Sequence, residues 1–304
     1  MTGSRPATGL AAQGLNTEAA LSDDVAAFGV YALPAPMERL RRFGQGLGRG
    51  TFARRACSVI RRVVSLGRRG PFDVEVFPGQ SARLYPADNL SEKRAFGGAQ
   101  FWDWAERAAL GRAVRAADEP VWFVDAGANA GLYSLAVRAE AGAKALKILA
   151  IEPDPENLKR LSFNFRASGA SGDVTVAEVA LGGEEGFATI ASGHANRGEL
   201  QLAEKGTKVA LRPLLSVIEW AGFPRIDALK IDIEGMELPV LRHFLMHAPR
   251  SLWPGMIILE ARRGEQTDAL TLLQESGYEI EEWTRMNVVL TAQMSQTSAA
   301  KRTG

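Results

Sequence analysis

The stretch Val121-Trp122-Phe123-Val124-Asp125-Ala126-Gly127-Ala128-Asn129-Ala130-Gly131 decides the fold. Four apolar residues, an acid and a glycine-rich segment indicate a buried strand that ends at Asp125 and turns into a helix. Gly127 and Gly131 let the backbone turn tightly and approach a ligand closely, and Asn129 tolerates unusual dihedral angles. Open α/β sheets bind their ligands at the carboxyl ends of such strands, where the acid at Asp125 suits a ligand with an ammonium group.

A second acid supports this interpretation. Glu152 ends the next predicted strand, twenty-one residues after Gly131, and Pro153 then stops that strand. In such folds an acid at this place accepts hydrogen bonds from both ribose hydroxyls. A dinucleotide fingerprint would need glycines where Asn129 and Leu132 stand, so a nucleotide-binding oxidoreductase is the less favoured alternative. The structural alternative is a tight turn in which Glu152 only caps the following helix.

The rest of the chain alternates apolar strands with amphipathic helices, which predicts a doubly wound, mainly parallel Rossmann-like sheet covered on both faces. Two final strand-like runs are separated by only about three residues, so they must form an antiparallel terminal hairpin. The predicted strands are 121–125, 147–152, 174–181, 229–233, 256–260, 278–283 and 287–291, and the predicted helices are 131–139, 155–167, 214–221, 236–247 and 266–276.

The sequence divides into five regions. Residues 1–36 lack a sustained period and are predicted to be disordered, and 294–304 are predicted to form a flexible tail. Residues 37–71 form a basic helical extension. Residues 72–120 contain a hairpin (Phe72–Val76 and Ser81–Tyr85) and a helix around Phe101–Val114, and 121–293 form the catalytic domain.

The formal net charge of +1 hides an asymmetry. Ten arginines and no acid lie between Arg39 and Arg69, which leaves 26 of the 36 basic residues against 35 acidic ones, a charge of −9. Three interpretations of the basic helix stay open: docking on the acidic body, contact with a membrane or another anionic carrier, and nucleic-acid binding, which ranks last because the body has no basic stripe with interleaved aromatics. The membrane interpretation would use Arg54, Arg55, Arg61 and Arg62.

The composition also limits the expected cellular location, disulfide bonds and type of metal site. The lone Cys57 excludes an intramolecular disulfide and a cysteine-rich zinc site. We find neither a secretory signal nor a run of about 20 apolar residues, and we therefore expect a cytoplasmic protein, with peripheral membrane contact as the open addition.

Three segments carry a family resemblance. The segment 123–131, the pair Glu152-Pro153 and above all Leu229-Lys230-Ile231-Asp232-Ile233-Glu234-Gly235-Met236-Glu237 resemble motifs of the FkbM family of S-adenosylmethionine-dependent methyltransferases. The likeness covers about residues 72–292. It implies a seven-stranded methyltransferase sheet, with an antiparallel strand near its edge, that binds S-adenosylmethionine.

The resemblance also implies roles for single residues. Asp125, Gly127, Asn129 and Gly131 would hold the methionyl part in a cofactor loop that includes Ala128, and Glu152, followed by Pro153, would hold the ribose. Ala180 and Leu181 would lie near the adenine. Leu211-Arg212 stands where the family usually has an acid, so no role is assigned there.

Two residues are candidates for the chemistry. Asp232 ends the fourth parallel strand beside the expected methyl position, and capping of the next helix is its alternative role. His194 lies in a predicted loop over the cofactor and is a candidate base, with an ordinary surface histidine as the alternative. We assign no metal ligand, although Asp232 with Glu234 and Glu260 offers oxygen ligands of the kind magnesium uses, and His243 and His247 have the spacing of helical zinc ligands.

The sequence thus predicts an O-methyltransferase that acts on a hydroxyl. By resemblance, the small-molecule or glycan acceptor would be a sugar, a glycolipid or a secondary metabolite. The alternatives are the oxidoreductase and a non-catalytic, membrane-associated scaffold that uses the arginine-rich helix.

Overall fold

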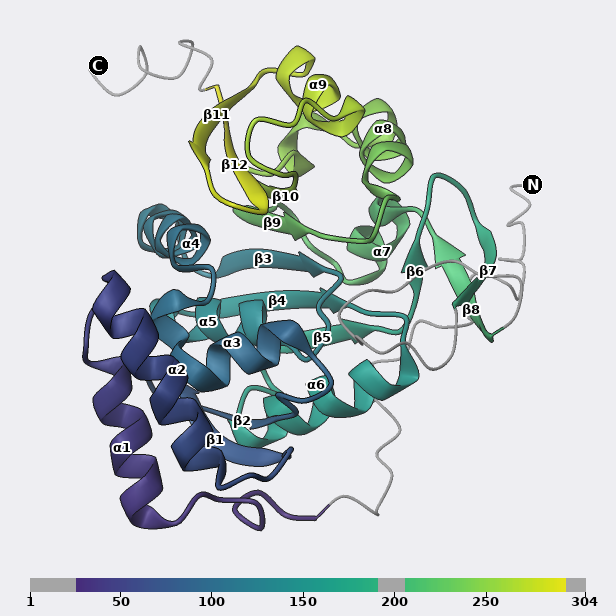
Figure 1. Ribbon diagram of the computed structural model, residues 1–304. Coiled ribbons are helices and arrows are strands. Elements are labelled where there is room, and N and C mark those ends of the chain that lie inside the picture. Colours follow the sequence, from purple (N-terminus) through teal and green to yellow (C-terminus); the bar gives the residue numbers. More distant parts are fainter. Residues whose placement is uncertain (1–25, 191–205, 294–304) are drawn as a thin grey trace, which may run out of the picture.

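The computed structural model describes residues 26–190 and 206–293 (Figure 1). Its centre is a seven-stranded sheet in the order β11-β12-β10-β9-β3-β4-β5. The five parallel strands are β3 (Val121–Ala126), β4 (Leu146–Ile151), β5 (Val174–Ala177), β9 (Ala228–Ile231) and β10 (Met256–Glu260). The doubly wound, mainly parallel sheet expected from the sequence is therefore confirmed.

The terminal hairpin closes one edge of the sheet. β11 (Tyr278–Trp283) and β12 (Asn287–Ala292) pair antiparallel, and β12 pairs antiparallel with β10, from Met256 opposite Thr291 to Glu260 opposite Asn287. This hairpin was predicted because its connection is too short for a helical crossover.

Two hydrophobic cores lie on opposite faces of the sheet, because neighbouring residues of each strand point to opposite sides. Phe123 and Ile148 belong to one core, and Val124 and Leu149 to the other. The first core is covered by α4 (Trp104–Ala116), α5 (Leu132–Ala141) and α6 (Pro155–Ala167). The second is covered by α7 (Leu214–Trp220), α8 (Glu237–His247) and α9 (Asp268–Glu275), with the 3-10 turn η2 (Arg250–Leu252) between α8 and β10.

One predicted strand is wrong in extent. The run 174–181 forms β5 only as far as Ala177, and Ala180–Leu181 form β6 in a separate small sheet of order β6-β8-β7. Its other strands are β7 (Gly186–Ile190) and β8 (Thr207–Arg212), and β6 is parallel to β8. The chain leaves the main sheet because Ala180 and Leu181 pair with Leu211 and Arg212, a long-range pairing that no local pattern indicates.

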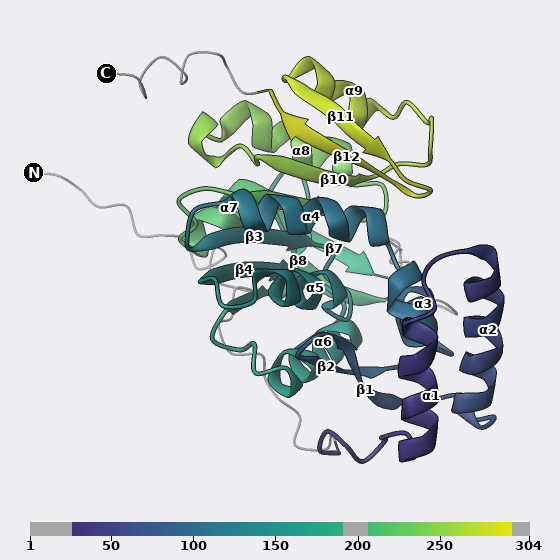
Figure 2. The ribbon, with the colours of Figure 1, turned by 90° about the vertical axis from the view of Figure 1, so that its left-hand side faces the viewer.

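The N-terminal part lies beside the first core (Figure 2). The predicted hairpin is β1 (Phe72–Phe77) with β2 (Gln80–Leu84), followed by α3 (Leu90–Gly98) and the 3-10 turn η1 (Ala99–Phe101). The basic extension contains two helices, α1 (Ala35–Gln45) and α2 (Thr51–Ser65). Within the described ranges, no helix combines the length and apolar character of a bilayer-crossing segment.

Two predictions of disorder fall largely outside the described residues, namely 1–25 of the first region and all of 294–304. From residue 26 onward the chain has defined contacts. The amide of Gly29 donates to Asp73 Oδ2 at 2.7 Å, and Leu33 is buried against the first core. The ordered part therefore begins at least ten residues before the boundary expected at residue 36.

Candidate active site

The loop that joins β3 to α5 is held by backbone hydrogen bonds to the end of β4. The amides of Gly127 and Ala128 both donate to the carbonyl oxygen of Ile151, each at 3.0 Å. Gly127 has φ +78°, and a Cβ atom at this position would lie 1.9 Å from the carbonyl oxygen of Asp232. Residue 127 must therefore be glycine because the loops after β3 and β9 touch here.

A cavity of about 1110 Å³, including its open mouth, lies at the carboxyl ends of β3, β4 and β9. Eight residues predicted from the sequence line it: Gly127, Ala128, Asn129, Glu152, Pro153, Ala180, Leu181 and Asp232. His194 lies outside the described residues.

Two predicted residues stand behind the cavity wall. Gly131 has φ +80°, and a Cβ atom there would lie 2.8 Å from Cε1 of Phe165, so this glycine serves the packing of α6 against the loop. Asp125 is fully buried, and its Oδ2 accepts hydrogen bonds from the amide and the hydroxyl of Ser134 at 3.1 and 2.7 Å. Neither residue lines the cavity, and both support the loop from behind, so the ligand contacts expected of them from the sequence stay predictions.

Glu152 fixes the loop from the neighbouring strand. Its Oε2 accepts from the amide of Asn129 at 2.8 Å, and its Oε1 accepts from the amide of Asp154 at 3.0 Å. The side chain is 1% exposed, and burial raises its pKa to about 7 against the three hydrogen bonds that lower it. Oε1 also accepts from Nδ2 of Asn157 at 3.3 Å, so Oε2 is the oxygen with room for a further hydrogen bond from a ligand in the cavity.

Lys230 is a site residue that sequence reasoning missed. It is 4% exposed, and its Nζ lies 3.1 Å from both the carbonyl oxygen of Gly127 and Oδ2 of Asp232. Burial favours the neutral amine, but Asp232 and Asp125 outweigh it, so the pKa of Lys230 is raised. A lone lysine inside the apolar strand β9 was the signal that could have identified it, since buried lysines need a charged partner.

Another part of the cavity lining comes from the turn before α4 and from α5, and it was also missed. Trp102, Asp103 and Tyr133 line the cavity, and the Tyr133 hydroxyl donates to Asp103 Oδ2 at 3.0 Å. Asp103 has φ +38°, and burial together with nearby Glu106 raises its pKa. Because α4 begins directly after Asp103, the turn before this helix supplies polar groups to the site.

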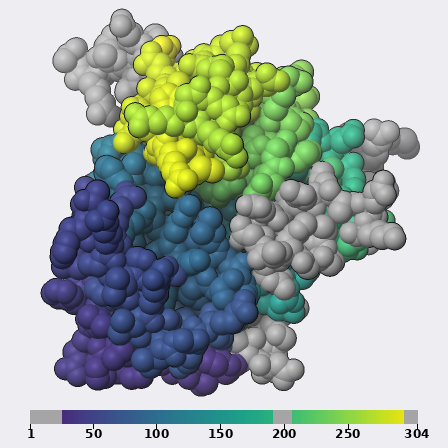
Figure 3. All heavy atoms as spheres, in the orientation of Figure 1, coloured from purple at the N-terminus to yellow at the C-terminus, as the bar shows by residue number. Residues whose placement is uncertain are grey.

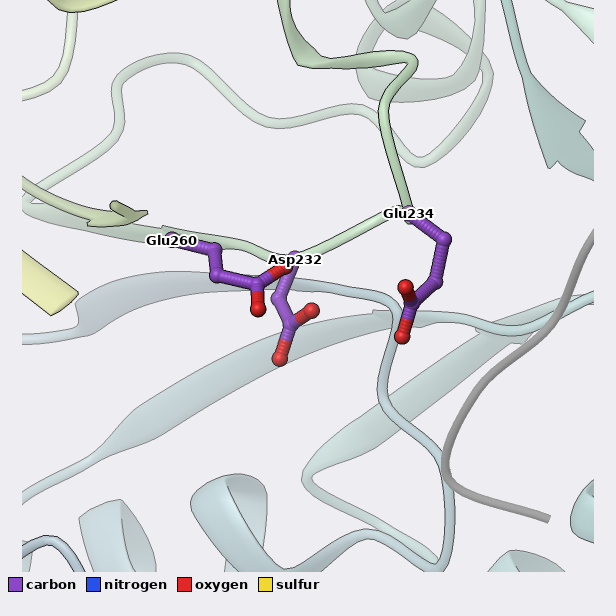
Figure 4. Close-up of side chains that lie close together, drawn as sticks. All are labelled: Asp232, Glu234 and Glu260. Carbon is purple, nitrogen blue, oxygen red and sulfur yellow. The ribbon is translucent and has the colours of Figure 1, made fainter. Parts of the chain in front are cut away.

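Asp232, Glu234 and Glu260 form a cluster in which one carboxylate oxygen of each lies within 4.8 Å of the others. Figure 4 shows the three carboxylate groups pointing to the same side of the strand ends. Burial and then the charges of Asp232 and Glu234 raise the pKa of Glu260 to about 8. The cluster has the oxygen donors that a cation needs, but Lys230 already provides a positive charge at Asp232.

The two histidines with zinc-like spacing lie elsewhere. His243 and His247 are stacked on α8 with ring centroids 4.3 Å apart, and neither lines the cavity.

Comparison with known proteins agrees with this geometry. The sequence model described as Methyltransferase FkbM domain matches residues 125–280, just over half of the chain. The chain belongs to the FkbM methyltransferase family. The matched region contains both cavity loops, after β3 and after β9.

Solved structures of other methyltransferases resemble this FkbM protein more distantly. One is the FkbM methyltransferase from Methylobacillus flagellatus, at 18% identity and a TM-score of 0.40, over 67% of this chain and 55% of that one. The present chain thus spans about half of that protein. Another is precorrin-6y C5,15-methyltransferase from Geobacter metallireducens, at 19% identity and a TM-score of 0.39, over 62% of this chain and 87% of that one. No curated protein sequence matches the chain.

Proposed function

We propose that this protein transfers the methyl group of S-adenosylmethionine to a hydroxyl of a sugar, a glycolipid or a secondary metabolite. The observation that carries the proposal is the position of Asp232. Its side chain lines the cavity, is 36% exposed, and lies beside the buried ammonium group of Lys230. A carboxylate in this place can take the proton of a hydroxyl acceptor.

The cavity fits the cofactor on three counts. The backbone of Gly127, Ala128 and Asn129 forms a wall without bulky side chains, and it suits the methionyl part. Glu152, held by two backbone amides, suits the ribose hydroxyls. Ala180 and Leu181 offer apolar contact at the end that suits the adenine.

The site has two tasks in the reaction, to position the acceptor oxygen and to remove its proton. The bound cofactor supplies an electrophilic methyl group on a sulfonium, and holding the acceptor oxygen in line with it does most of the work. Asp232 accepts the hydroxyl proton as the oxygen–carbon bond forms and the carbon–sulfur bond breaks. The ammonium of Lys230, 3.1 Å from Oδ2 of Asp232, holds this carboxylate in place at the cavity.

Further polar groups of the cavity lining favour a hydroxylated acceptor. Asp103 and Tyr133 present a carboxylate and a phenol to the cavity, and Trp102 packs against Tyr133 with ring centroids 4.9 Å apart. Such a combination of hydrogen-bonding groups and aromatic rings suits the polar edge and apolar face of a sugar ring.

The test is a screen of hydroxylated acceptors with radiolabelled S-adenosylmethionine, followed by the variant Asp232→Asn. The variant should lower kcat by about a hundredfold and leave S-adenosylhomocysteine affinity unchanged. Glu275→Gln, an exposed carboxylate of α9 outside the cavity lining, is the control and should keep most of the activity. Methylation of amines with no activity on any hydroxyl would contradict the proposal, and so would full activity of Asp232→Asn.

A further inference from the structure

The outer face of α2 differs from that of a typical solvent-exposed helix in its side chains. Its buried residues Ala53, Cys57 and Val64 face the protein. Figures 1 and 2 both place α1 and α2 at the outside of the molecule, beyond α3 and the β1–β2 hairpin. In Figure 3 the purple and dark blue atoms of this N-terminal part form one whole corner of the surface.

Apolar side chains on this outer face are exposed. Phe52 is 78% exposed, Val59 58%, Val63 46% and Leu66 56%. Their spacing of seven, four and three residues places them along one side of the helix. The neighbouring helix α1 adds Phe43 at 64% exposure. An exposed apolar stripe of this kind indicates a surface that contacts a ligand, another protein or a membrane.

The arginines of α2 divide into two pairs. Arg55 and Arg62 are exposed and lie on the same side of the helix as the apolar stripe. Arg54 is also exposed, and its guanidinium lies 5.4 Å from the ring centroid of Phe101. The stem of Arg61 lies against Gly97, where a Cβ atom would be 2.7 Å from its Cδ. Of the four arginines expected to contact a membrane, Arg55 and Arg62 are therefore the two that lie beside the apolar stripe.

The charge of this face is not neutralised by the protein. Among the described residues, no carboxylate lies within 4.0 Å of an α2 arginine, whereas Arg41 and Arg42 of α1 pair with Glu38. Apolar and backbone contacts hold α2 in place instead, such as Cys57 Sγ at 3.1 Å from the carbonyl oxygen of Gly44. Docking on the acidic body, one of the three interpretations of the sequence, therefore does not account for this face.

We propose that the outer face of α2, made of Phe52, Arg55, Val59, Arg62, Val63 and Leu66, binds the surface of an anionic lipid bilayer. The helix would lie in the plane of the interface, with the apolar stripe at the acyl boundary and the arginines on lipid phosphates. Nucleic acid fits less well because its phosphate backbone offers no apolar surface on which the exposed valine and leucine side chains could be buried. A second copy of the chain fits less well because a symmetric contact would bring unpaired arginines together.

The test uses the full chain in vesicle co-sedimentation. The protein should bind vesicles of phosphatidylcholine with phosphatidylglycerol, bind phosphatidylcholine alone weakly, and lose binding as salt rises. The double variants Arg55→Ser/Arg62→Ser and Phe52→Ser/Val63→Ser should each lower the partition coefficient about tenfold or more. These positions are exposed, so melting temperatures should hardly change.

The matched control is Arg262→Ser/Arg263→Ser, which removes two exposed arginines between β10 and α9. It should keep binding within about twofold, since charge lost far from the lipid surface has little effect. Absence of binding to anionic vesicles would overturn the proposal. Equal binding by wild type and Phe52→Ser/Val63→Ser would also overturn it, because the attraction would then be purely electrostatic. A dimer in solution that Phe52→Ser/Val63→Ser converts to a monomer would assign the face to a second copy instead.

Discussion

Replacing Gly127 by alanine tests the contact that closes the cavity floor. The chain offers a matched control in Gly79, which has nearly the same dihedral angle, φ +70° against +78°, but nothing within 4 Å of a Cβ atom. An alanine in this left-handed region costs about 1 kcal/mol. Gly79→Ala should therefore lower the free energy of unfolding by about that amount.

Gly127→Ala should cost considerably more. The new Cβ atom would lie 1.9 Å from the carbonyl oxygen of Asp232, well inside the ordinary contact distance of 3.4 Å or more. The displaced Asp232 also donates from its amide to the carbonyl oxygen of Ala126 at 3.1 Å, and this bond would be strained. Overpacking adds about 1–3 kcal/mol to the dihedral cost, so we expect a total loss of about 3 kcal/mol.

Urea unfolding followed by circular dichroism measures both variants. Gly127→Ala should also bind S-adenosylhomocysteine at least about tenfold more weakly, because its misplaced loop forms the cavity wall, while Gly79→Ala should bind normally. The reasoning is refuted if the two variants lose the same free energy of unfolding.

Three further predictions concern buried charges. The pKa of Glu152 is about 7, so the wild-type affinity for S-adenosylhomocysteine should rise as the pH increases through 7. Glu152→Gln should bind S-adenosylhomocysteine about tenfold more weakly and without this pH dependence. Calorimetric titration of both proteins at several pH values tests this prediction. Lys230→Met should lower the free energy of unfolding, measured in urea, by about 3 kcal/mol, because buried Asp125 loses its counter-charge. This loss should become smaller at acidic pH, where Asp125 is protonated. Burial and then the charges of Asp232 and Glu234 raise the pKa of Glu260 to about 8 from its ordinary 4.5, so the wild type loses stability as the pH rises between these values. Glu260→Gln should melt higher than wild type above pH 8 and no higher near pH 4.5. Equal melting temperatures above pH 8 would mean that the fold does not disfavour the ionised form of Glu260.

The central sheet could be predicted because its strands are buried on both faces. Val121–Ala126 and Leu146–Ile151 are nearly continuous apolar runs; Gly127 follows the first directly, and Pro153 follows the second after Glu152. The terminal hairpin followed from the short connection between Trp283 and Asn287 alone. The helix α3 was missed although its signal is present: the Asn89 side chain caps it by accepting from the amide of Glu92 at 3.1 Å.

The candidate site was only half predictable. Residues at strand ends, such as Glu152 and Asp232, reach the cavity because strand ends meet at one edge of a parallel sheet. Asp103 and Tyr133 reach it only because α4 and α5 pack side by side, and no spacing along the sequence indicates that packing. Gly131 and Asp125 were assigned to the ligand because a glycine or an acid in a loop looks the same in sequence whether it faces the ligand or supports the loop from behind.

The central claim is that the cavity at the ends of β3, β4 and β9 is the S-adenosylmethionine site. Isothermal titration of the purified protein with S-adenosylhomocysteine tests it directly, because product binding needs no knowledge of the acceptor. We predict one binding site per chain and competition by S-adenosylmethionine but not by a dinucleotide. Ala180→Phe should lose binding, because Ala180 lines the cavity and the larger phenylalanine ring would occupy part of it. Unchanged binding in both Ala180→Phe and Glu152→Gln, or binding of a dinucleotide alone, would contradict the claim.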